Sequence, residues 1–230
     1  LINVTGEESF FASNQWVFGL MMALVTALVI IGGIRSIAKV TSKLVPTMCV
    51  IYILSALLVL VVNAQAIPGA IGMIVTEAFQ PRAAVTGGIL AAFIWGMRRA
   101  TFSNEAGIGS APIAHSAVKT DDPTTEGLVS LLEPFVDTVI ICTLTALVII
   151  TSGVYITGQE IEGARMTSQA FGTVLPTFPY LLALVATLFA FSTMISWSYY
   201  GVKAVTFIFG ESKNIETLYK VIFCLFAIIG

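Results

Sequence analysis

The sequence predicts an all-α fold, a bundle of helices that span a membrane. Of its 230 residues, 57% are hydrophobic and only 10% are charged, and the mean hydropathy is +0.95. A soluble core cannot bury that much apolar surface. Several apolar runs also reach the length of about 20 residues that a membrane-spanning helix needs. We therefore expect a single transmembrane domain over residues 1–230, with the lipid bilayer as its surroundings and no nucleic-acid partner.

Six hydrophobic segments are expected, at residues 16–34, 44–63, 84–118, 126–152, 178–209 and 218–230. Five of them are long enough to span. The third segment suits two half-helices, at about 88–100 and 108–118, better than one continuous helix. Polar connections are expected at 65–83, 119–125 and 153–177, and the last is an external loop with a short helix around 170–175. Because the chain opens with Leu1 and stops in apolar sequence at Gly230, we expect a fragment of a longer protein.

The basic residues indicate which connections face the cytoplasm. Seven of the eleven Lys and Arg residues fall in alternate connections, beginning with the one between the first two segments. They are Arg35, Lys39, Lys43, Lys119, Lys203, Lys213 and Lys220. Lys and Arg accumulate on the cytoplasmic side of membrane proteins, so these connections are predicted to be cytoplasmic and the N-terminus external. This pattern favours a multi-pass protein of the cell inner (plasma) membrane.

A polar, glycine-rich stretch interrupts the third segment. Residues 103–115 read Ser-Asn-Glu-Ala-Gly-Ile-Gly-Ser-Ala-Pro-Ile-Ala-His. A carboxylate and unpaired backbone groups are costly in lipid, so this stretch belongs where protein or water surrounds it. Gly107 and Gly109 allow a helix to stop. Ser110 can cap a following helix whose first turn accepts Pro112. An interrupted helix near the membrane midplane is the usual substrate and ion site of a secondary transporter, and its two ends suit an amino-acid zwitterion.

Three titratable side chains need separate interpretations. Glu105 is expected to anchor the backbone at the break, with a gate or a protonatable coupling group as the alternatives. Asp137 follows Glu133 by one turn, and intramembrane carboxylates are functional candidates, although a structural pair is an equal possibility. His115 lies five residues after Ser110, on a different helix face, so a Ser-His dyad is not expected. A satisfied histidine, in the interior or near a loop, is the better interpretation, and no other pattern in the sequence favours an enzyme.

The fifth segment carries a second polar group of side chains, within residues 191–201. Ser192 and Thr193 offer hard oxygen ligands for a small cation if backbone carbonyls from another segment complete the shell. Alternatively, they only bond the preceding helical turn or a neighbouring helix, as hydroxyls in membrane helices commonly do.

The sequence resembles the signature of the alanine or glycine:cation symporter family at residues 103–115, followed by residues 117–120 and later by Asp137-Thr138. The resemblance extends to residues 32–34, 44–46, 142–147 and 189–201, and so covers nearly the whole chain. It implies sodium-coupled uptake of small neutral amino acids, chiefly alanine or glycine, by alternating access. It also implies a fold of two inverted five-helix repeats, in which the first five segments here would be the fourth to eighth helices. The first three helices would be missing.

The resemblance implies sodium as a co-substrate and no organic cofactor. It matches Ser192 and Thr193 to a sodium site on the eighth helix, and we expect Phe102 and Trp197 to be walls of the substrate site. The remaining substrate-binding candidates lie at the break: Ser103, Asn104, Glu105, Gly107, Gly109 and Ser110. Proton coupling through Glu105 or Asp137 is the main alternative within transporters. A channel or a sensor that shares the broken helix is the alternative from another class.

Overall fold

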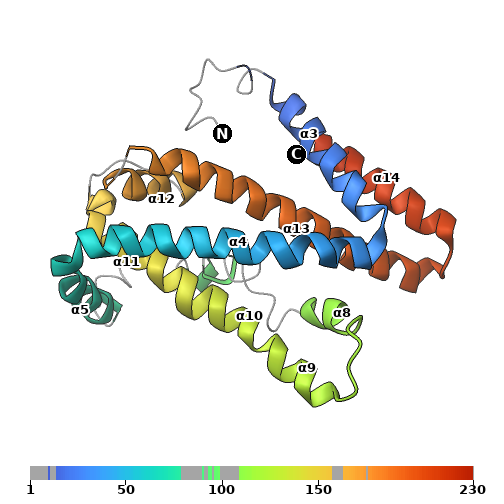
Figure 1. Cartoon of the computed structure of the whole chain (residues 1–230), viewed down its shortest axis with the longest axis horizontal. Helices are drawn as coiled ribbons and strands as arrows, with labels where there is room; N and C mark the ends of the chain where they lie inside the picture. Colours follow the sequence, from blue (N-terminus) through green and yellow to red (C-terminus); the bar gives the residue numbers. More distant parts are fainter. Residues whose placement is uncertain are drawn as a thin grey trace. The chain divides into compact units, whose positions relative to one another are not determined.

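In the computed structural model every regular element of the described residues is a helix, as the sequence predicts. The structure describes residues 10, 14–78, 90, 93–94, 96–98, 109–156, 163–174 and 176–229. Within them, Gly33–Val62, Pro123–Ser152 and Phe178–Phe209 are long and apolar enough to cross a membrane. The first predicted segment forms the shorter apolar helix α3, Gln15–Ile30 (Figure 1). The chain is therefore a multi-pass membrane protein.

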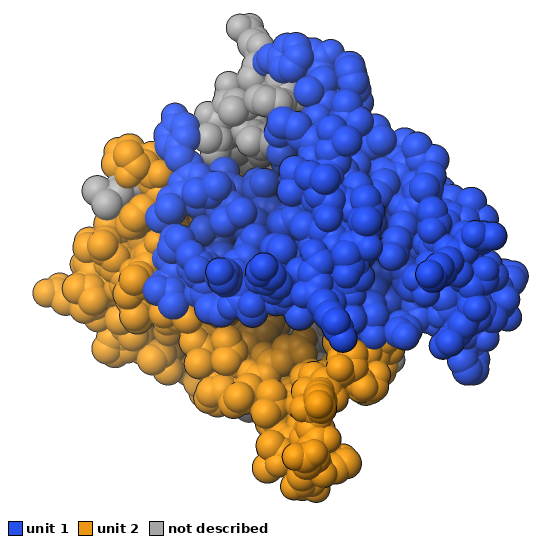
Figure 2. Space-filling view, turned by 45° about the vertical axis from the view of Figure 1, so that its right-hand side comes forward, with its two compact units in different colours: residues 1–52, 179–230 blue, residues 53–178 orange. Residues whose placement is uncertain are grey.

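The helices divide between two compact units (Figure 2). The first unit comprises residues 1–52 and 179–230. It contains α3, the first two thirds of α4 (Gly33–Val62), nearly all of α13 (Phe178–Phe209), and α14 (Lys213–Ile229). A buried cluster holds these helices together, and its four members are Ile30, Ile37, Phe191 and Ile195. Phe223 and Cys224 of α14 pack against the same cluster.

Helices α3 and α14 lie side by side in this unit (Figure 1). Their backbones approach closely at Gly19, where an added Cβ would lie 2.5 Å from the carbonyl oxygen of Ile228. Small residues are what allow such an approach between apolar helices, because no side chain then separates the two backbones.

Helix α4 corrects one expectation, because Arg35, Lys39 and Lys43 belong to its first turns rather than to a connection. Its 30 residues extend over about 45 Å at 1.5 Å per residue, against a hydrocarbon core of about 30 Å. Residues 44–62 alone reach about 28 Å, so they suffice to span. The three basic side chains are exposed and four residues apart, which places them on one face of the extra length.

The second unit, residues 53–178, holds the shorter elements and the fourth predicted segment. After the end of α4 its elements are η1 (Ala64–Ala66), α5 (Ile67–Ala78), α8 (Ala111–His115), α9 (Pro123–Ser130), α10 (Leu132–Pro134), η2 (Phe135–Cys142), α11 (Thr143–Ser152), η3 (Val154–Ile156) and α12 (Gly163–Gly172). Helix α11 packs against α5 and α12. Val148, Ala170 and Phe171 are fully buried there, and the rings of Phe171 and Phe178 meet edge to face at 6.2 Å.

Two predicted connections contain helices. The stretch 65–83 was expected to be a polar connection, but most of it forms η1 and α5. Its residues 67–78 are mainly apolar, and the helix they form packs on α11, which explains the difference. The hydroxyl of Tyr155 also lies 3.1 Å from the sulfur of Met73 in α5. The stretch 153–177 contains α12, which begins at Gly163, earlier than the short helix expected around 170–175.

The fourth predicted segment is continuous from Pro123 to Ser152, but its middle is not an α-helix. Residues 135–142, the element η2, form a π-helix directly after Pro134. Proline lacks an N–H group and its ring clashes with the carbonyl four residues earlier, so it disturbs the α-helical hydrogen bonds around it. The hydropathy of the segment gives no sign of this wider helix, and the sequence analysis did not predict it.

Candidate functional site

The break in the third segment is described from Gly109 onward. Gly109 has a φ of +90°, a conformation that favours glycine, and α8 starts two residues later. Pro112 lies in the first turn of α8, as expected. A helix therefore begins after Gly109, where the restart was predicted, although α8 ends at His115 and not near residue 118. The predicted stop lies outside the described residues. Ser110 stands at the N-cap position with helical φ and ψ of −78° and −39°, and its side chain makes no capping bond, since that bond needs an extended backbone.

The other residues expected at the break, Phe102, Ser103, Asn104, Glu105 and Gly107, lie outside the described residues. Their roles in substrate binding, and the role of Glu105 in coupling or gating, remain predictions.

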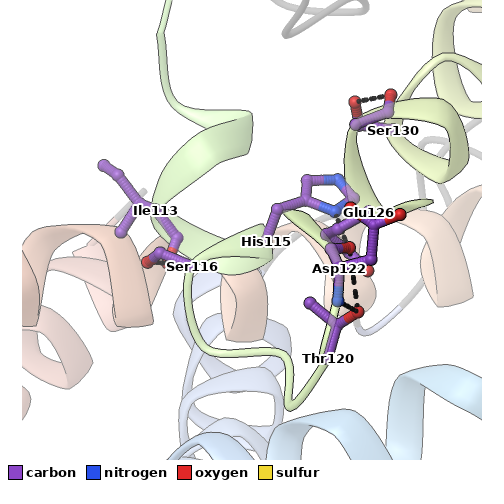
Figure 3. Close-up of polar contacts among 8 residues, drawn as sticks. Ile113, His115, Ser116, Thr120, Asp122, Glu126 and Ser130 are labelled. Atoms are coloured by element: carbon purple, nitrogen blue, oxygen red, sulfur yellow. Dashed lines mark hydrogen bonds and ion pairs between the residues drawn. The ribbon is translucent and has the colours of Figure 1, made fainter. Parts of the chain in front are cut away.

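His115 joins α8 to α9. Its Nδ1 atom lies 2.5 Å from Oε1 of Glu126, and the two side chains are only 26% and 18% exposed. Figure 3 shows the imidazole turned toward the carboxylate from the end of α8. His115 is thus a satisfied histidine near a loop, as the sequence predicts. The sequence analysis did not single out Glu126; an acidic residue in the first turn after Asp122-Pro123 is the signal that could have found it.

The start of α9 is held by a side-chain cap. Asp122 has an extended backbone, and its Oδ1 accepts a hydrogen bond from the backbone N–H of Thr124 at 2.9 Å. The hydroxyl of Thr125 donates to the other carboxylate oxygen at 3.3 Å. These bonds favour the charged carboxylate, and the one from Thr124 contributes most to lowering the pKa of Asp122 below its ordinary value. Pro123 then takes the first helical position, where its missing N–H has no consequence.

Ser192 and Thr193 lie near the middle of α13, in the first unit. Ser192 is 6% exposed, and its hydroxyl donates to the carbonyl of Phe189 at 2.8 Å. This is the bond to the preceding helical turn that the sequence analysis gave as the structural alternative. It uses the proton of the hydroxyl and leaves the oxygen lone pairs available to a cation. Thr193 is half-buried beside it. The bond is compatible with a ligand role and does not establish one, so the sodium site remains a prediction.

Trp197 lies one turn beyond Thr193 and is 40% exposed, with its ring 6.2 Å from that of Tyr200. Its place in the wall of a substrate site remains a prediction. Trp197 and the serine-threonine pair belong to the first unit, whereas Gly109 and Ser110 belong to the second.

Asp137 lies on the π-helix η2 and is half-buried. A π-helical segment within a membrane helix is frequently found at a functional site, and a carboxylate there is a functional candidate for an independent reason. Both observations keep Asp137 among the candidates for coupling, where its role is still a prediction. Glu133, one turn earlier, is exposed on α10.

Comparison with known proteins tests the resemblance. The sequence model of the sodium:alanine symporter family matches residues 3–230. The sodium/alanine symporter AgcS of Methanococcus maripaludis is 40% identical over 224 residues, which are 96% of this chain and 49% of that protein. The amino-acid carrier protein AlsT of Bacillus subtilis is 37% identical (93% of this chain, 45% of AlsT). The probable sodium/glutamine symporter GlnT of the same organism is 34% identical, with the same coverage.

This chain spans about half the length of the curated relatives it matches. The match is not confined to the motif at the break, because it begins at residue 3 and continues to residue 230. The family is one of transporters and not of enzymes, and it agrees with the resemblance found in the sequence. This chain belongs to the sodium:alanine symporter family.

Proposed function

We propose that the full-length protein containing this chain takes up a small neutral amino acid together with sodium. The observation that carries the proposal is the family match over residues 3–230, supported by a relative named as a sodium/alanine symporter at 40% identity. Binding of both solutes near the membrane midplane, followed by exposure to the other side, is how such carriers work. An inward sodium gradient would drive uptake, with about 2.3 kcal/mol per charge for each 100 mV of membrane potential.

The chain supplies part of the proposed machinery. Segments one to five take the places of the fourth to eighth helices of a fold with two inverted five-helix repeats, in the cell inner membrane. The broken segment binds the amino acid, and Ser192 and Thr193 coordinate sodium through their hydroxyl oxygens. The helices that would complete both sites lie outside this chain, in agreement with its coverage of about half of each relative.

Alanine or glycine is the proposed substrate. AgcS is named for alanine and GlnT for glutamine, so the substrates in the names of these relatives differ in size. A bulky side chain such as Trp197 in the wall of the site would restrict the substrate to small amino acids. Exchange of a wall residue for a smaller one would then admit a larger substrate.

The test is uptake of labelled alanine by the full-length protein in liposomes, with an inward sodium gradient, an inward proton gradient, or no gradient. We expect accumulation with the sodium gradient alone, abolished by an ionophore that collapses it. Uptake with the proton gradient alone would instead favour proton coupling through Glu105 or Asp137. Counterflow of labelled alanine against unlabelled alanine separates a carrier from a channel, and binding without any movement of alanine would indicate a sensor.

A further inference from the structure

Helix α8 is too short to hold its position by itself. Its five residues extend over about 7 to 8 Å. Isolated helices need more than about 12 residues to be even marginally stable, so α8 depends on contacts with the rest of the protein. Its N-terminal end follows Gly109 and Ser110, which belong to the proposed amino-acid site. Its C-terminal end is His115.

The C-terminal end of α8 has a specific partner. His115 Nδ1 and Glu126 Oε1 are in direct hydrogen-bonding contact, and both side chains are more than 70% covered. Hydrogen bonds to a carboxylate are roughly twice as strong as those between neutral groups, and partial burial protects this one from water. Figure 3 shows that the bond closes the loop of residues 116–122, which connects α8 to α9.

Glu126, the partner of His115, lies on a helix that is capped and long. Glu126 lies in the first turn of α9, whose start is capped by Asp122 and begins with Pro123. The helix continues through α10 and the π-helix into α11, over the whole span Pro123–Ser152. The polar residues of the connection reinforce the cap, since the hydroxyl of Thr120 accepts from the backbone N–H of Asp122 at 3.3 Å. Glu126 therefore gives His115 an attachment point on a membrane-spanning helix.

We propose that His115 and Glu126 form a positioning pair that sets the affinity for the transported amino acid. This inference rests on the proposed function. The pair does not touch the substrate; it holds the end of α8 so that Gly109 and Ser110 stay in place at the substrate site. When the pair is broken, α8 occupies its binding-competent position for a smaller fraction of the time. The apparent dissociation constant rises in inverse proportion to that fraction.

A double-mutant cycle in the full-length protein tests the proposal. The variants are His115→Ala, Glu126→Ala, the double variant, and the exchanged pair His115→Glu with Glu126→His. The readout is the alanine concentration for half-maximal sodium-driven uptake in liposomes, together with the maximal rate. We expect each single change to raise that concentration about tenfold or more, the scale of one lost hydrogen bond to a charged group, with the maximal rate within about twofold. The half-saturation concentration of the double variant should be no higher than that of the more impaired single variant.

The exchanged pair decides the outcome if a single variant folds poorly. Recovery of the wild-type half-saturation concentration in the exchanged pair supports the proposal. Failure of a folded exchanged pair to recover it, additive effects of the two single changes, or a fall in the maximal rate alone would overturn it. An ion pair on α14 supplies a matched control, since Nζ of Lys220 lies 3.9 Å from Oε2 of Glu216. The double substitution Lys220→Ala with Glu216→Ala should leave the half-saturation concentration for uptake unchanged.

Alanine uptake by the wild-type protein distinguishes failure of this inference from failure of the proposed function on which it rests. Absence of alanine uptake by the wild-type protein would overturn the proposed function, and the positioning pair with it. Normal uptake by the wild-type protein, with additive effects of the variants, would overturn the pair alone.

Discussion

The side chain of Tyr219 occupies the space that a side chain at position 201 would fill. A Cβ atom added to Gly201 would lie 1.7 Å from the hydroxyl oxygen of Tyr219 and 2.3 Å from the ring carbon that carries it. Gly201 belongs to α13 and Tyr219 to α14. The two helices of this unit therefore meet at a point where one contributes an aromatic ring and the other contributes only backbone.

Gly201→Ala should destabilise the protein by about 1–3 kcal/mol, because the ring of Tyr219 must leave its place. Thermal unfolding of the purified protein measures the effect. The second change Tyr219→Ala should remove most of the penalty of the first, whereas Tyr219→Phe should not, since the ring carbon itself is too close. Gly72→Ala is the matched control, because nothing lies within 4 Å of its added Cβ. Equal effects at positions 201 and 72 would contradict the packing described here.

Gly19→Ala should separate α3 from α14. The nearest atom to the added Cβ is the backbone oxygen of Ile228 at 2.5 Å, and a backbone atom cannot turn aside as a side chain can. The helices must move apart, and the contact between them loosens along its length. We expect a lower thermal midpoint than the wild type, and no second change at a side chain should restore it. Gly127→Ala, with open space around its Cβ, should be neutral or slightly stabilising.

Ser192→Ala combined with Thr193→Ala should raise the sodium concentration needed for half-maximal alanine uptake by about tenfold or more, if these hydroxyls bind sodium. The bond from Ser192 to the carbonyl of Phe189 is also lost, so folding must be checked by thermal unfolding. Ser198→Ala is the control, since its hydroxyl makes the same kind of bond, to Ile195 at 2.7 Å, and is also buried. An unchanged sodium requirement in the double variant would eliminate the ion site.

Asp122→Ala should destabilise the protein at neutral pH and not in acid. The pKa of Asp122 is lowered in the folded state, so its carboxylate stabilises the fold above the unfolded pKa of 3.8, and this contribution disappears as the pH falls through the lower folded value. The difference in thermal midpoint between wild type and variant should therefore shrink as the pH is lowered below about 4. Asp122→Asn should resemble the wild type at neutral pH, because asparagine caps helices equally well, and its thermal midpoint should not show the loss that the wild type suffers in acid. If the difference in thermal midpoint between the wild type and Asp122→Ala did not change with pH, the charged carboxylate would not be its cause.

Labelling of single cysteines tests the predicted orientation. In a background without Cys49, Cys142 and Cys224, Ser42→Cys is placed on the basic first turns of α4, and Gln169→Cys on α12. Both positions are exposed. A membrane-impermeant maleimide added outside intact cells should label position 169 and spare position 42 until the membrane is opened. The opposite pattern would reverse the topology.

Local composition determined much of this fold. The segments at 44–63, 126–152 and 178–209 were predicted from apolar length alone, and each lies within, or differs by a few residues from, a long helix of the structure. The restart after Gly109 was also predicted, because positive φ and a proline in the first turn are requirements of the backbone itself. Membership of the symporter family follows from ordered motifs, which are likewise a property of the chain and need no coordinates.

The tertiary structure decided what depends on partners far along the chain. Helix α4 begins eleven residues before its apolar run at Leu44, because its basic turns can be helical without being buried. The partner of His115 lies in the next helix, and the need for Gly201 is explained only by a ring on another helix. Hydropathy reports whether a residue prefers lipid or water. Only the folded chain determines which two side chains meet, since that depends on how closely the backbones approach.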